Sequence, residues 1–346
     1  MSALPDTIKT AVVGYGYSAQ TFHIPFLMAQ LAYDLVAISS SQTAAIEKAM
    51  PGMAVFKSAE VMIEQAGADL LIITAPNDVH YSLIKHALLN DMHVVVEKPF
   101  VTRSKDGEEL IKLAEERGKI LTVYHNRRWD GDFLTIKKLI KNNTLGKIRY
   151  FESHFDRFRM DVRDRWRETA ANGGGLLYDL GSHLLDQALQ LFGPPEAISA
   201  TCKTMRPGGT TTDLAHITLH YADMLAVLHM SVFSAGPNRR FQVQGELGTY
   251  EKYGLDPQED RLKAGMKPVP KEWADEEPKH YGTLYRTDST ETLPTERGGY
   301  QQFFSLMKDA ILHKGLAPVA AKDALMTIKL IELAAKSSET GKTLRL

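Results

Sequence analysis

Cysteine is nearly absent from the sequence, since Cys202 is the single thiol in 346 residues. One cysteine can form neither an internal disulfide nor a Cys-x-x-Cys redox or zinc pair. This excludes disulfide-stabilised secreted folds and zinc ribbons. We therefore expect the protein to work in a reducing compartment, the cytoplasm.

Net charge and long apolar runs are lacking as well. The 41 Lys and Arg balance 42 Asp and Glu, which removes the bulk attraction that drives non-specific binding to nucleic acid or anionic membranes. No uninterrupted apolar run approaches the ~18 residues of a membrane span, and the first residues contain no apolar stretch of signal-peptide length. We expect a small-molecule partner, with no nucleic acid and no membrane involved.

The length predicts roughly two domains of about 150 residues each. In the first part of the chain, short β-branched runs alternate with helical patterns, and the runs are apolar on both faces, which is typical of covered parallel strands. The expected strands are residues 10–13, 35–39, 70–74, 93–96 and 121–123. The expected helices are residues 21–31, 79–89 and 105–117. This βαβα order predicts an α/β fold with a doubly wound parallel sheet.

Beyond residue 123 the strands become longer, and apolar and polar residues partly alternate, which is typical of a half-exposed antiparallel sheet. The expected strands are residues 147–155, 197–205, 216–221, 225–233 and 241–245. The expected helices are residues 134–140, 176–192, 301–313 and 321–337, and residues 256–293 are expected to be a long surface excursion. We predict a first domain over residues 1–123 and an α+β domain over residues 124–346 with a large, mostly antiparallel open sheet. The last helices should pack back toward the first domain.

A glycine-rich turn, Gly14-Tyr15-Gly16-Tyr17-Ser18-Ala19, joins the first expected strand to a helix. Glycines at the first two positions allow a tight turn and let a pyrophosphate approach the backbone, while the helix N-terminus supplies N–H groups. Such turns also occur wherever a strand meets a helix closely. Because this one opens a βα series, it favours dinucleotide binding by the first domain.

Three serines, Ser39, Ser40 and Ser41, stand at the end of the second expected strand. A NAD site usually has Asp or Glu there, about 20 residues after the glycines, to accept hydrogen bonds from the ribose diol. Hydroxyls and backbone N–H groups instead tolerate a 2′-phosphate, which favours NADP over NAD. A simple polar loop is the alternative interpretation.

Two further motifs follow strands at the carboxyl edge of the sheet, where ligands of open α/β folds bind. Glu97-Lys98-Pro99 follows one strand, and Thr74-Ala75-Pro76-Asn77-Asp78-Val79-His80 follows another. A lysine near a bound nicotinamide can hydrogen-bond a substrate hydroxyl and stabilise a developing alkoxide. The alternatives are a surface Lys-Pro turn and a helix cap at Asn77 or Asp78.

The helix expected over residues 176–192 places Asp179 one turn before His183. A carboxylate at this position can fix the imidazole tautomer and raise its basicity, as a general base for a hydroxyl proton requires. The same spacing occurs on ordinary helix surfaces, so the pair alone leaves both interpretations open. The second histidine and open carboxylate of a metal site are missing here, and we expect no metal.

Aromatic and charged residues are interleaved in two segments. One is Tyr124-His125-Asn126-Arg127-Arg128-Trp129-Asp130, and the other holds five arginines among three aspartates over residues 156–167, around Trp166. The admixture of acids argues against a nucleic-acid surface and favours internal ion pairs or a polyol-binding rim, of which we favour the rim.

Together these motifs resemble the glucose–fructose oxidoreductase / inositol dehydrogenase (Gfo/Idh/MocA) family along essentially the whole chain. The resemblance rests on the order and spacing of Gly14-x-Gly16-x-x-Ala19, Glu97-Lys98-Pro99 and Tyr178-Asp179-Leu180-Gly181-Ser182-His183. The stretches VYHNRRWDGDFLTIKKLI, RDRWRE, LYDLGSHLLDQ and KYGLDPQEDRLKAG look closer still to the NADP-dependent scyllo-inositol dehydrogenase branch. One departure is Ser41, where that branch tends to have Arg.

The resemblance implies a Rossmann domain followed by an α/β domain whose open sheet often makes the oligomer contact. It implies a cis Lys98-Pro99 peptide, His183 as the base, and Lys98 as proton donor or alkoxide stabiliser beside a catalytic Asp179. It also implies that Glu97, Asn77 and His80 line the nicotinamide half of the cofactor site. We expect that site in a cleft between the domains.

The predicted site residues fall into three sets. The catalytic set is Lys98, Asp179 and His183. The cofactor-binding set is Gly14, Gly16, Tyr17, Ser18, Ser39, Ser40, Ser41, Thr74, Pro76, Asn77, His80, Glu97, Lys98, Asn126, Trp166 and Arg167. The substrate-binding set is Lys98, His125, Arg157, Arg165, Tyr178, Asp179 and His183.

We expect an NAD(P)-dependent dehydrogenase that moves a hydride between nicotinamide C4 and a secondary alcohol of a cyclic polyol or sugar, with scyllo-inositol as the first candidate. An aldose or sugar-acid dehydrogenase of the same family is the nearest alternative, and a non-catalytic NAD(P)-sensing regulator is an alternative of another class. A homodimer or homotetramer is expected.

Overall fold

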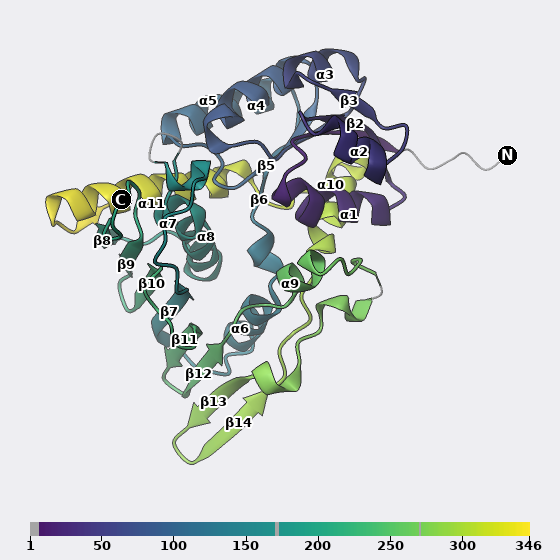
Figure 1. Cartoon of the computed structure of the whole chain (residues 1–346). Helices are drawn as coiled ribbons and strands as arrows, with labels where there is room; N and C mark the ends of the chain where they lie inside the picture. The colour runs from purple at the N-terminus through teal and green to yellow at the C-terminus, as the bar shows by residue number, and fades with distance from the viewer. Residues whose placement is uncertain (1–6, 170–172, 270) are drawn as a thin grey trace. The chain divides into compact units, whose positions relative to one another are not determined.

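The computed structural model describes residues 7–169, 173–269 and 271–346, and the chain divides into two compact units (Figure 1). Unit 1 consists of Met1–His125, Gln258–Trp273 and Tyr300–Leu325. Unit 2 consists of Asn126–Pro257, Ala274–Gly299 and Met326–Leu346. The first border is close to the expected one at residue 123, but two later segments return to unit 1.

Unit 1 is built from alternating strands and helices. Its strands are β1 (Ile8–Val13), β2 (Tyr33–Ser39), β3 (Ala54–Phe56), β4 (Leu70–Ile73), β5 (His93–Glu97) and β6 (Leu121–Tyr124). Its helices are η1 (Ala19–His23), α1 (Ile24–Ala29), α2 (Thr43–Ala49), α3 (Ala59–Gln65), η2 (Asn77–Val79), α4 (His80–Leu89), α5 (Ser104–Glu116), α9 (Gln258–Lys263) and α10 (Gln301–His313). The short η6 (Lys271–Ala274) and the long α11 (Ala321–Thr340) run from unit 1 into unit 2.

The strands of unit 1 form a parallel sheet, in the described part of the chain, with the order β3-β2-β1-β4-β5-β6. Helices α3, α4 and α5 lie on one face of this sheet, and α1 and α10 lie on the other (Figure 1). The prediction of a doubly wound parallel sheet is confirmed. The strand order reverses beside β1, so the carboxyl ends of β1 and β4 flank the switch point at which such sheets bind ligands.

Burial explains which strands the sequence revealed. All four residues of β4 are fully buried, and their uninterrupted apolar run satisfies both covered faces of the sheet. Strand β3 was not expected, because it has only three residues and is half-buried at the sheet edge. Helices α2 and α3, which flank it, were not expected either.

Helix α10 completes the core of unit 1 although it lies far along the chain. Phe304 stacks on Phe26 with ring centroids 5.3 Å apart, and its carbonyl accepts a 2.5 Å hydrogen bond from the hydroxyl of Tyr33. Further on, the Thr122 hydroxyl of β6 donates to the Val319 carbonyl at 2.7 Å. The residues after 300 are therefore an integral part of this unit.

Unit 2 contains the second sheet. Its strands are β7 (Ile148–Asp156), β8 (Ala197–Lys203), β9 (Leu214–His220), β10 (Leu225–Ser231), β11 (Arg239–Gly245), β12 (Gly248–Tyr253), β13 (Gly282–Arg286), β14 (Ser289–Leu293) and β15 (Leu344–Arg345). Its helices are η3 (Asn126–Trp129), α6 (Gly131–Lys141), η4 (Trp166–Glu168), α7 (Leu176–Asp179), α8 (Gly181–Phe192) and η7 (Pro278–His280).

The order of this sheet among the described residues is β14-β13-β12-β11-β7-β10-β9-β8-β15, and every neighbouring pair except β7 and β10 is antiparallel. The mostly antiparallel sheet is thus confirmed. On one face, α8 packs its buried Leu184, Leu185 and Ala188 beside β10. On the other face, polar side chains of β7 alternate with buried ones and stay half-exposed.

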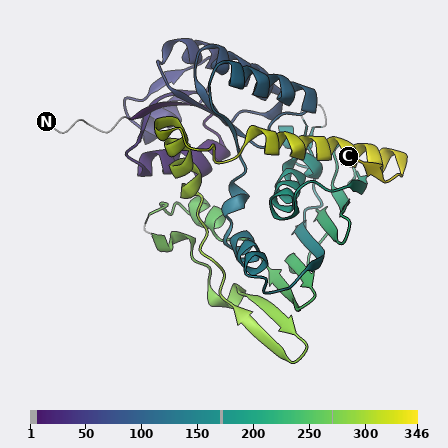
Figure 2. The same cartoon turned by 180° about the vertical axis from the view of Figure 1, so that it is seen from behind.

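Residues 256–293 differ from the expected surface excursion. They include α9 and a hairpin of β13 and β14, the light-green strands of Figures 1 and 2, which extends the sheet at one edge. Strand β14 is exposed over nearly its whole length, so it lacks the alternation that would have predicted it. In the parts of the chain that are described, no helix is long and apolar enough to cross a membrane.

Candidate active site

The turn after β1 needs a glycine at its first position. Gly14 has a φ of 96°, and a Cβ added there would lie 2.5 Å from the Thr74 hydroxyl oxygen. Its N–H donates to the Ser39 carbonyl at 2.9 Å, and the Thr74 hydroxyl donates to the Val13 carbonyl at 2.7 Å. These contacts bring the ends of β1, β2 and β4 together, as the sequence predicted.

Gly16 has a different reason to be glycine. Its backbone lies outside the left-handed region, and a Cβ added there would meet nothing within 4 Å. Gln20 and Gln42 hold the turn by donating to the Tyr15 carbonyl at 2.7 and 3.1 Å. The open space over Gly16, shortly before η1, fits the close approach of a pyrophosphate to the backbone and to the helix N–H groups.

Replacing Gly16 by Ala should separate binding from folding. The new methyl group has room, so stability should stay unchanged or rise by up to about 1 kcal/mol. It would occupy the space that a pyrophosphate needs, and we expect affinity for NADPH, measured by fluorescence titration, to fall at least about tenfold, or about 1.4 kcal/mol. Gly14→Ala is the comparison variant, which should lose both. Unchanged NADPH affinity in Gly16→Ala would contradict this use of the turn.

The end of β2 holds the three predicted serines in different environments. Ser39 is buried, the Ser40 hydroxyl accepts a 3.1 Å bond from the Gln42 N–H, and Ser41 is exposed. Tyr17, also predicted, is exposed and donates its hydroxyl to Glu259 of α9 at 2.8 Å. The Ser41 side chain is therefore available to a ligand at this edge.

Glu97, at the end of β5, ties the glycine-rich turn to the lysine motif. Its carboxylate accepts a hydrogen bond from the Ser18 hydroxyl, lies 2.9 Å from His23 Nε2, and accepts the Lys98 N–H at 3.2 Å. Burial raises the pKa of Glu97, but the contacts with His23, Ser18 and Lys98 outweigh it and lower the pKa below its usual range. These contacts favour the ionised carboxylate, which links the backbone of Lys98 to the turn.

The side chain of His80 is fully buried and contacts the backbone of the Glu97-Lys98-Pro99 motif. Its Nδ1 lies 3.0 Å from the Pro99 carbonyl oxygen and its Nε2 lies 3.0 Å from the Ala75 carbonyl oxygen. Burial lowers the pKa of His80, although these carbonyl groups oppose the shift. The Lys98-Pro99 peptide is cis, as the resemblance implied. His80 acts on the site through the backbone of this turn, and Asn77 is buried at the start of η2.

The helix expected over residues 176–192 is divided, and Asp179 and His183 lie on either side of the break. Asp179 ends α7 and His183 is in the first turn of α8. The Ser182 hydroxyl donates to the Tyr178 carbonyl at 2.7 Å, a contact of the kind that bends helices. Asp179 and Tyr178 are half-buried and His183 is 5% exposed, and burial raises the pKa of Tyr178.

A small, partly open pocket in unit 2 brings together Asp179 and four arginines. Its lining includes Arg157, Arg159, Arg165, Arg206 and Glu168. Glu168 accepts from Arg165 at 3.1 Å and from Arg206 at 2.7 Å, so one carboxylate serves two guanidinium groups. Burial and the neighbouring arginines lower the pKa of Arg159. The pocket therefore combines excess positive charge with a carboxylate, a combination suited to a polyhydroxylated or acidic ligand.

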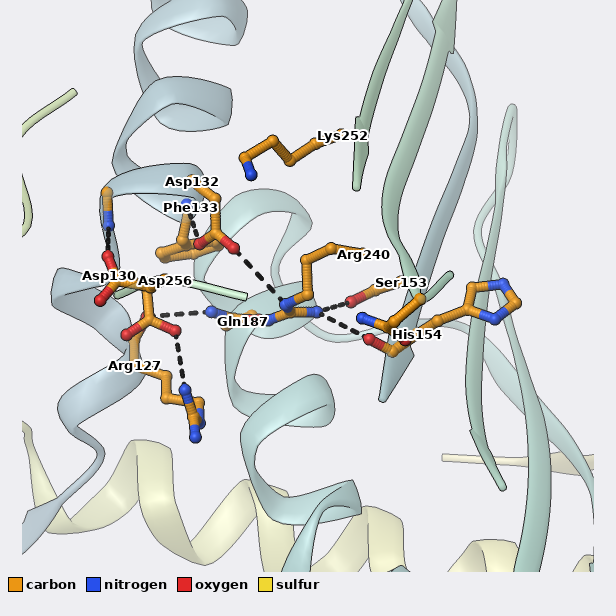
Figure 3. Close-up of polar contacts among 12 residues, drawn as sticks. Arg127, Asp130, Asp132, Phe133, Ser153, His154, Gln187, Arg240, Lys252 and Asp256 are labelled. Atoms are coloured by element: carbon orange, nitrogen blue, oxygen red, sulfur yellow. Dashed lines mark hydrogen bonds and ion pairs between the residues drawn. The ribbon is translucent and has the colours of Figure 1, made fainter. Parts of the chain in front are cut away.

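A buried ionic cluster surrounds Arg240 in unit 2 (Figure 3). Arg240 is fully buried and donates to Ser153 and Gln187 at 2.6 Å each, while its Nε lies 3.6 Å from Asp132. Its guanidinium also lies 4.8 Å from the ring centroid of Phe155. A second guanidinium, of Arg127, lies 4.7 Å from the same centroid.

Phe155 lies between this cluster and His183, the predicted base. The ring centroids of Phe155 and His183 are 6.5 Å apart. Phe155, at the end of β7, is therefore held by two cations and in turn packs near the imidazole of His183.

Comparison with known proteins decides the family. Residues 8–125 match the GFO_IDH_MocA model described as "Oxidoreductase family, NAD-binding Rossmann fold". Residues 137–346 match its counterpart, "Oxidoreductase family, C-terminal alpha/beta domain". The chain belongs to the Gfo/Idh/MocA oxidoreductase family. It is accordingly an enzyme of the NAD(P)-dependent type that acts on CH–OH groups.

Several members of the Gfo/Idh/MocA family match the whole chain. The oxidoreductase YdgJ of Escherichia coli, itself uncharacterized, is 41% identical over 345 residues, with 99% of each chain covered. The scyllo-inositol 2-dehydrogenase (NADP(+)) IolW of Bacillus subtilis is 37% identical, covering 99% of this chain and 96% of the relative. The solved structure of the oxidoreductase YvaA of B. subtilis superimposes with a TM-score of 0.94 at 37% identity, with 99% of each chain covered.

The remaining predicted residues are placed as follows. Thr74 and Pro76 follow β4, and Thr74 lies beside Gly14. His125 is buried at the end of unit 1, and Asn126 is buried at the start of unit 2. Trp166 begins η4, and the side chain of Arg167 is outside the described residues.

The sequence did not point to four residues of this Gfo/Idh/MocA site. Arg159 is in the arginine-rich segment over residues 156–167 and Phe155 is in the strand expected over residues 147–155, but neither pattern singles these residues out. Arg206 and Arg240 come from distant parts of the chain, and only the folded structure brings them to the pocket and the cluster. An arginine within a strand otherwise apolar on the covered face, as at position 240, is a signal that could have been used.

Proposed function

We propose that the protein is a scyllo-inositol 2-dehydrogenase-like enzyme, which interconverts a ring hydroxyl of a cyclic polyol and the corresponding ketone. One observation carries the proposal. Glu97 accepts from the Ser18 hydroxyl and from the backbone N–H of Lys98, so the backbone of Lys98 lies next to the expected nucleotide site. The similarity to the B. subtilis scyllo-inositol 2-dehydrogenase supports the choice of substrate.

The proposed roles follow from chemistry. A bound nicotinamide would supply the hydride acceptor or donor for the carbinol carbon. His183 removes the hydroxyl proton, Asp179 orients the imidazole, and Lys98 hydrogen-bonds the same oxygen and stabilises its negative charge. The backbone at Gly14 and Gly16, with Ser18 and the Ser39–Ser41 run, would hold the dinucleotide.

NADP is the proposed cofactor. No carboxylate stands at positions 39 to 41 to repel a 2′-phosphate, and Ser41 is exposed. Replacing Ser41 by Arg should raise the ratio of kcat/KM for NADP+ over NAD+ by about tenfold, because a charge-assisted hydrogen bond contributes about 1.5–3 kcal/mol before solvent screening. Ser41→Asp is the matched opposite and should shift the ratio toward NAD+. A ratio unaffected by either change would place the 2′ position elsewhere.

The test of the function is a substrate panel. The full chain is incubated with NADP+ or NAD+ and with scyllo-inositol, myo-inositol, aldoses and sugar acids, and the absorbance of the reduced cofactor is followed. We expect turnover to be fastest with scyllo-inositol and NADP+. Cofactor binding without turnover on any polyol or sugar would support a sensing regulator instead.

A sugar-acid dehydrogenase is the second candidate, because the pocket beside Asp179 has four arginines against two carboxylates. If the substrate carries a carboxylate, Arg159→Gln should lower kcat/KM for acids far more than for neutral inositols. Equal effects on both would favour the neutral polyol.

A cytoplasmic location and a homodimer or homotetramer remain part of the proposal. The single cysteine supports the first. Fractionation of the source cells and sedimentation of the purified chain would test the two points.

A further inference from the structure

The half-exposed face of the second sheet carries histidines and carboxylates on three neighbouring strands. Glu152, His154 and Asp156 alternate along β7 and so share this face. The register sets His229 of β10 opposite His154, and His216 of β9 opposite His229. The three imidazoles stand side by side, with ring centroids 5.1 and 5.6 Å apart. Figure 3 shows the His154 ring pointing away from the Arg240 cluster.

Three of these side chains direct ligand atoms to one point. One such atom from each of His154, Asp156 and His229 lies within 4.8 Å of the others. Asp156 is between the two rings, with Oδ2 2.9 Å from His154 Nδ1 and Oδ1 3.6 Å from His229 Nε2. Oδ1 is buried and accepts no hydrogen bond from the described residues. A carboxylate lone pair is thus available between two imidazole nitrogens.

In both His154 and His229, the ring nitrogen that does not face Asp156 contacts another side chain. His154 Nε2 lies 2.6 Å from Glu152, whose carboxylate also accepts from Arg239 at 2.8 Å. His229 Nδ1 lies 3.4 Å from His216 Nδ1. Histidines that ligate metals are usually oriented in this way, by a carboxylate or other group on the nitrogen that faces away from the ion.

We propose that His154, Asp156 and His229 form a binding site for a divalent transition-metal ion, of which Zn²⁺ fits best. Two imidazole nitrogens and one carboxylate oxygen are a ligand set that Zn²⁺ uses with a fourth position left open. Mg²⁺ and Ca²⁺ prefer oxygen ligands and do not match it. The three side chains are 12 to 23% exposed in the single chain.

The ion would join β7 and β10, which pair in parallel without a hairpin between them. The sequence led us to expect no metal, because only strand pairing brings position 229 to positions 154 and 156. The site involves none of the residues proposed for the dehydrogenase reaction, so the two proposals can fail separately.

The test is a titration of the full chain with ZnCl₂ after removal of bound metal by EDTA, followed by calorimetry. We expect one Zn²⁺ per chain and no binding of Mg²⁺. Asp156→Asn and His229→Ala should each weaken binding at least about 100-fold, and Glu152→Gln, which keeps all three ligands, about 10 to 100-fold. His220→Ala is the matched control, because His220 is a β9 histidine whose Nε2 contacts the Ser199 hydroxyl at 2.9 Å.

Co²⁺ provides a second readout, since a tetrahedral Co²⁺ absorbs visible light. The band should appear with the unaltered chain and with His220→Ala, and be lost with Asp156→Asn or His229→Ala, all with unchanged circular dichroism. Absence of saturable Zn²⁺ binding would overturn the proposal. So would equal Zn²⁺ affinity in the ligand variants and the control, which would show binding at other surface groups.

Discussion

Replacing His183 by Ala, or Lys98 by Met, should lower kcat by about 10²–10⁴-fold, the usual contribution of a positioned acid or base. The affinity for NADPH should change little, because neither side chain belongs to the glycine-rich turn. Steady-state rates with the best substrate of the panel and a fluorescence titration with NADPH measure the two quantities. The pH dependence of kcat/KM is informative as well. A general base must be deprotonated to act, so removing His183 should abolish the fall of kcat/KM at low pH.

Two exposed residues provide matched controls for these variants. His313, in the last turn of α10, and Lys112, on α5, should tolerate the same substitutions with no effect on rate. Full turnover in His183→Ala would remove His183 from the proton transfer, and full turnover in Lys98→Met would do the same for Lys98. Loss of NADPH affinity along with turnover would instead indicate damage to the nucleotide site.

Replacing Arg240 by Met should destabilise the protein by about 3–5 kcal/mol, as expected when one partner of a buried ion pair is removed. Arg240 and Asp132 are both fully buried, and Ser153 and Gln187 would also lose the donor that each now faces. At about 2–4 °C per kcal/mol, the melting temperature should fall by about 6–20 °C. Calorimetry or circular dichroism would measure it.

Two comparisons isolate the cause. The double variant Arg240→Met with Asp132→Leu should recover much of the loss, because no unpaired charge then remains. Arg149→Met removes a surface cation that is 46% exposed and paired with Glu246, and should cost less than about 1 kcal/mol. A similar small loss for Arg240→Met would mean that the cluster does not hold the unit together.

The fold could be predicted where burial leaves a strong pattern. Strands covered on both faces, such as β4, are continuous apolar runs, and the glycine-rich turn opens the βα series that they form. Strands β3 and β14 could not be found in this way. The first is too short, and the second is exposed along nearly all of its length. The break between α7 and α8 is accompanied by a hydrogen bond from the Ser182 hydroxyl to the Tyr178 carbonyl, and helical periodicity does not predict such a contact.

The same distinction applies to the site residues, some of which could be predicted from the sequence and some of which could not. Residues at the carboxyl ends of strands of the parallel sheet, such as Ser39, Thr74 and Glu97, come together because parallel strands end at one edge. The arginine pocket and the histidine cluster depend on loops and on strand pairing across long sequence separations. No local spacing encodes that Arg206 meets Glu168, or that His229 faces His154.

The late position of α10 in the chain affects how the protein is made. Tyr33 and Phe26 leave the ribosome early, but their partner Phe304 follows much later. At the usual ~5–20 residues per second, roughly 10–40 s separate the synthesis of residue 125 from that of residue 304. During that interval the nascent sheet has an uncovered apolar flank, so chaperone binding should be strongest then, and fragments that stop before residue 300 should aggregate.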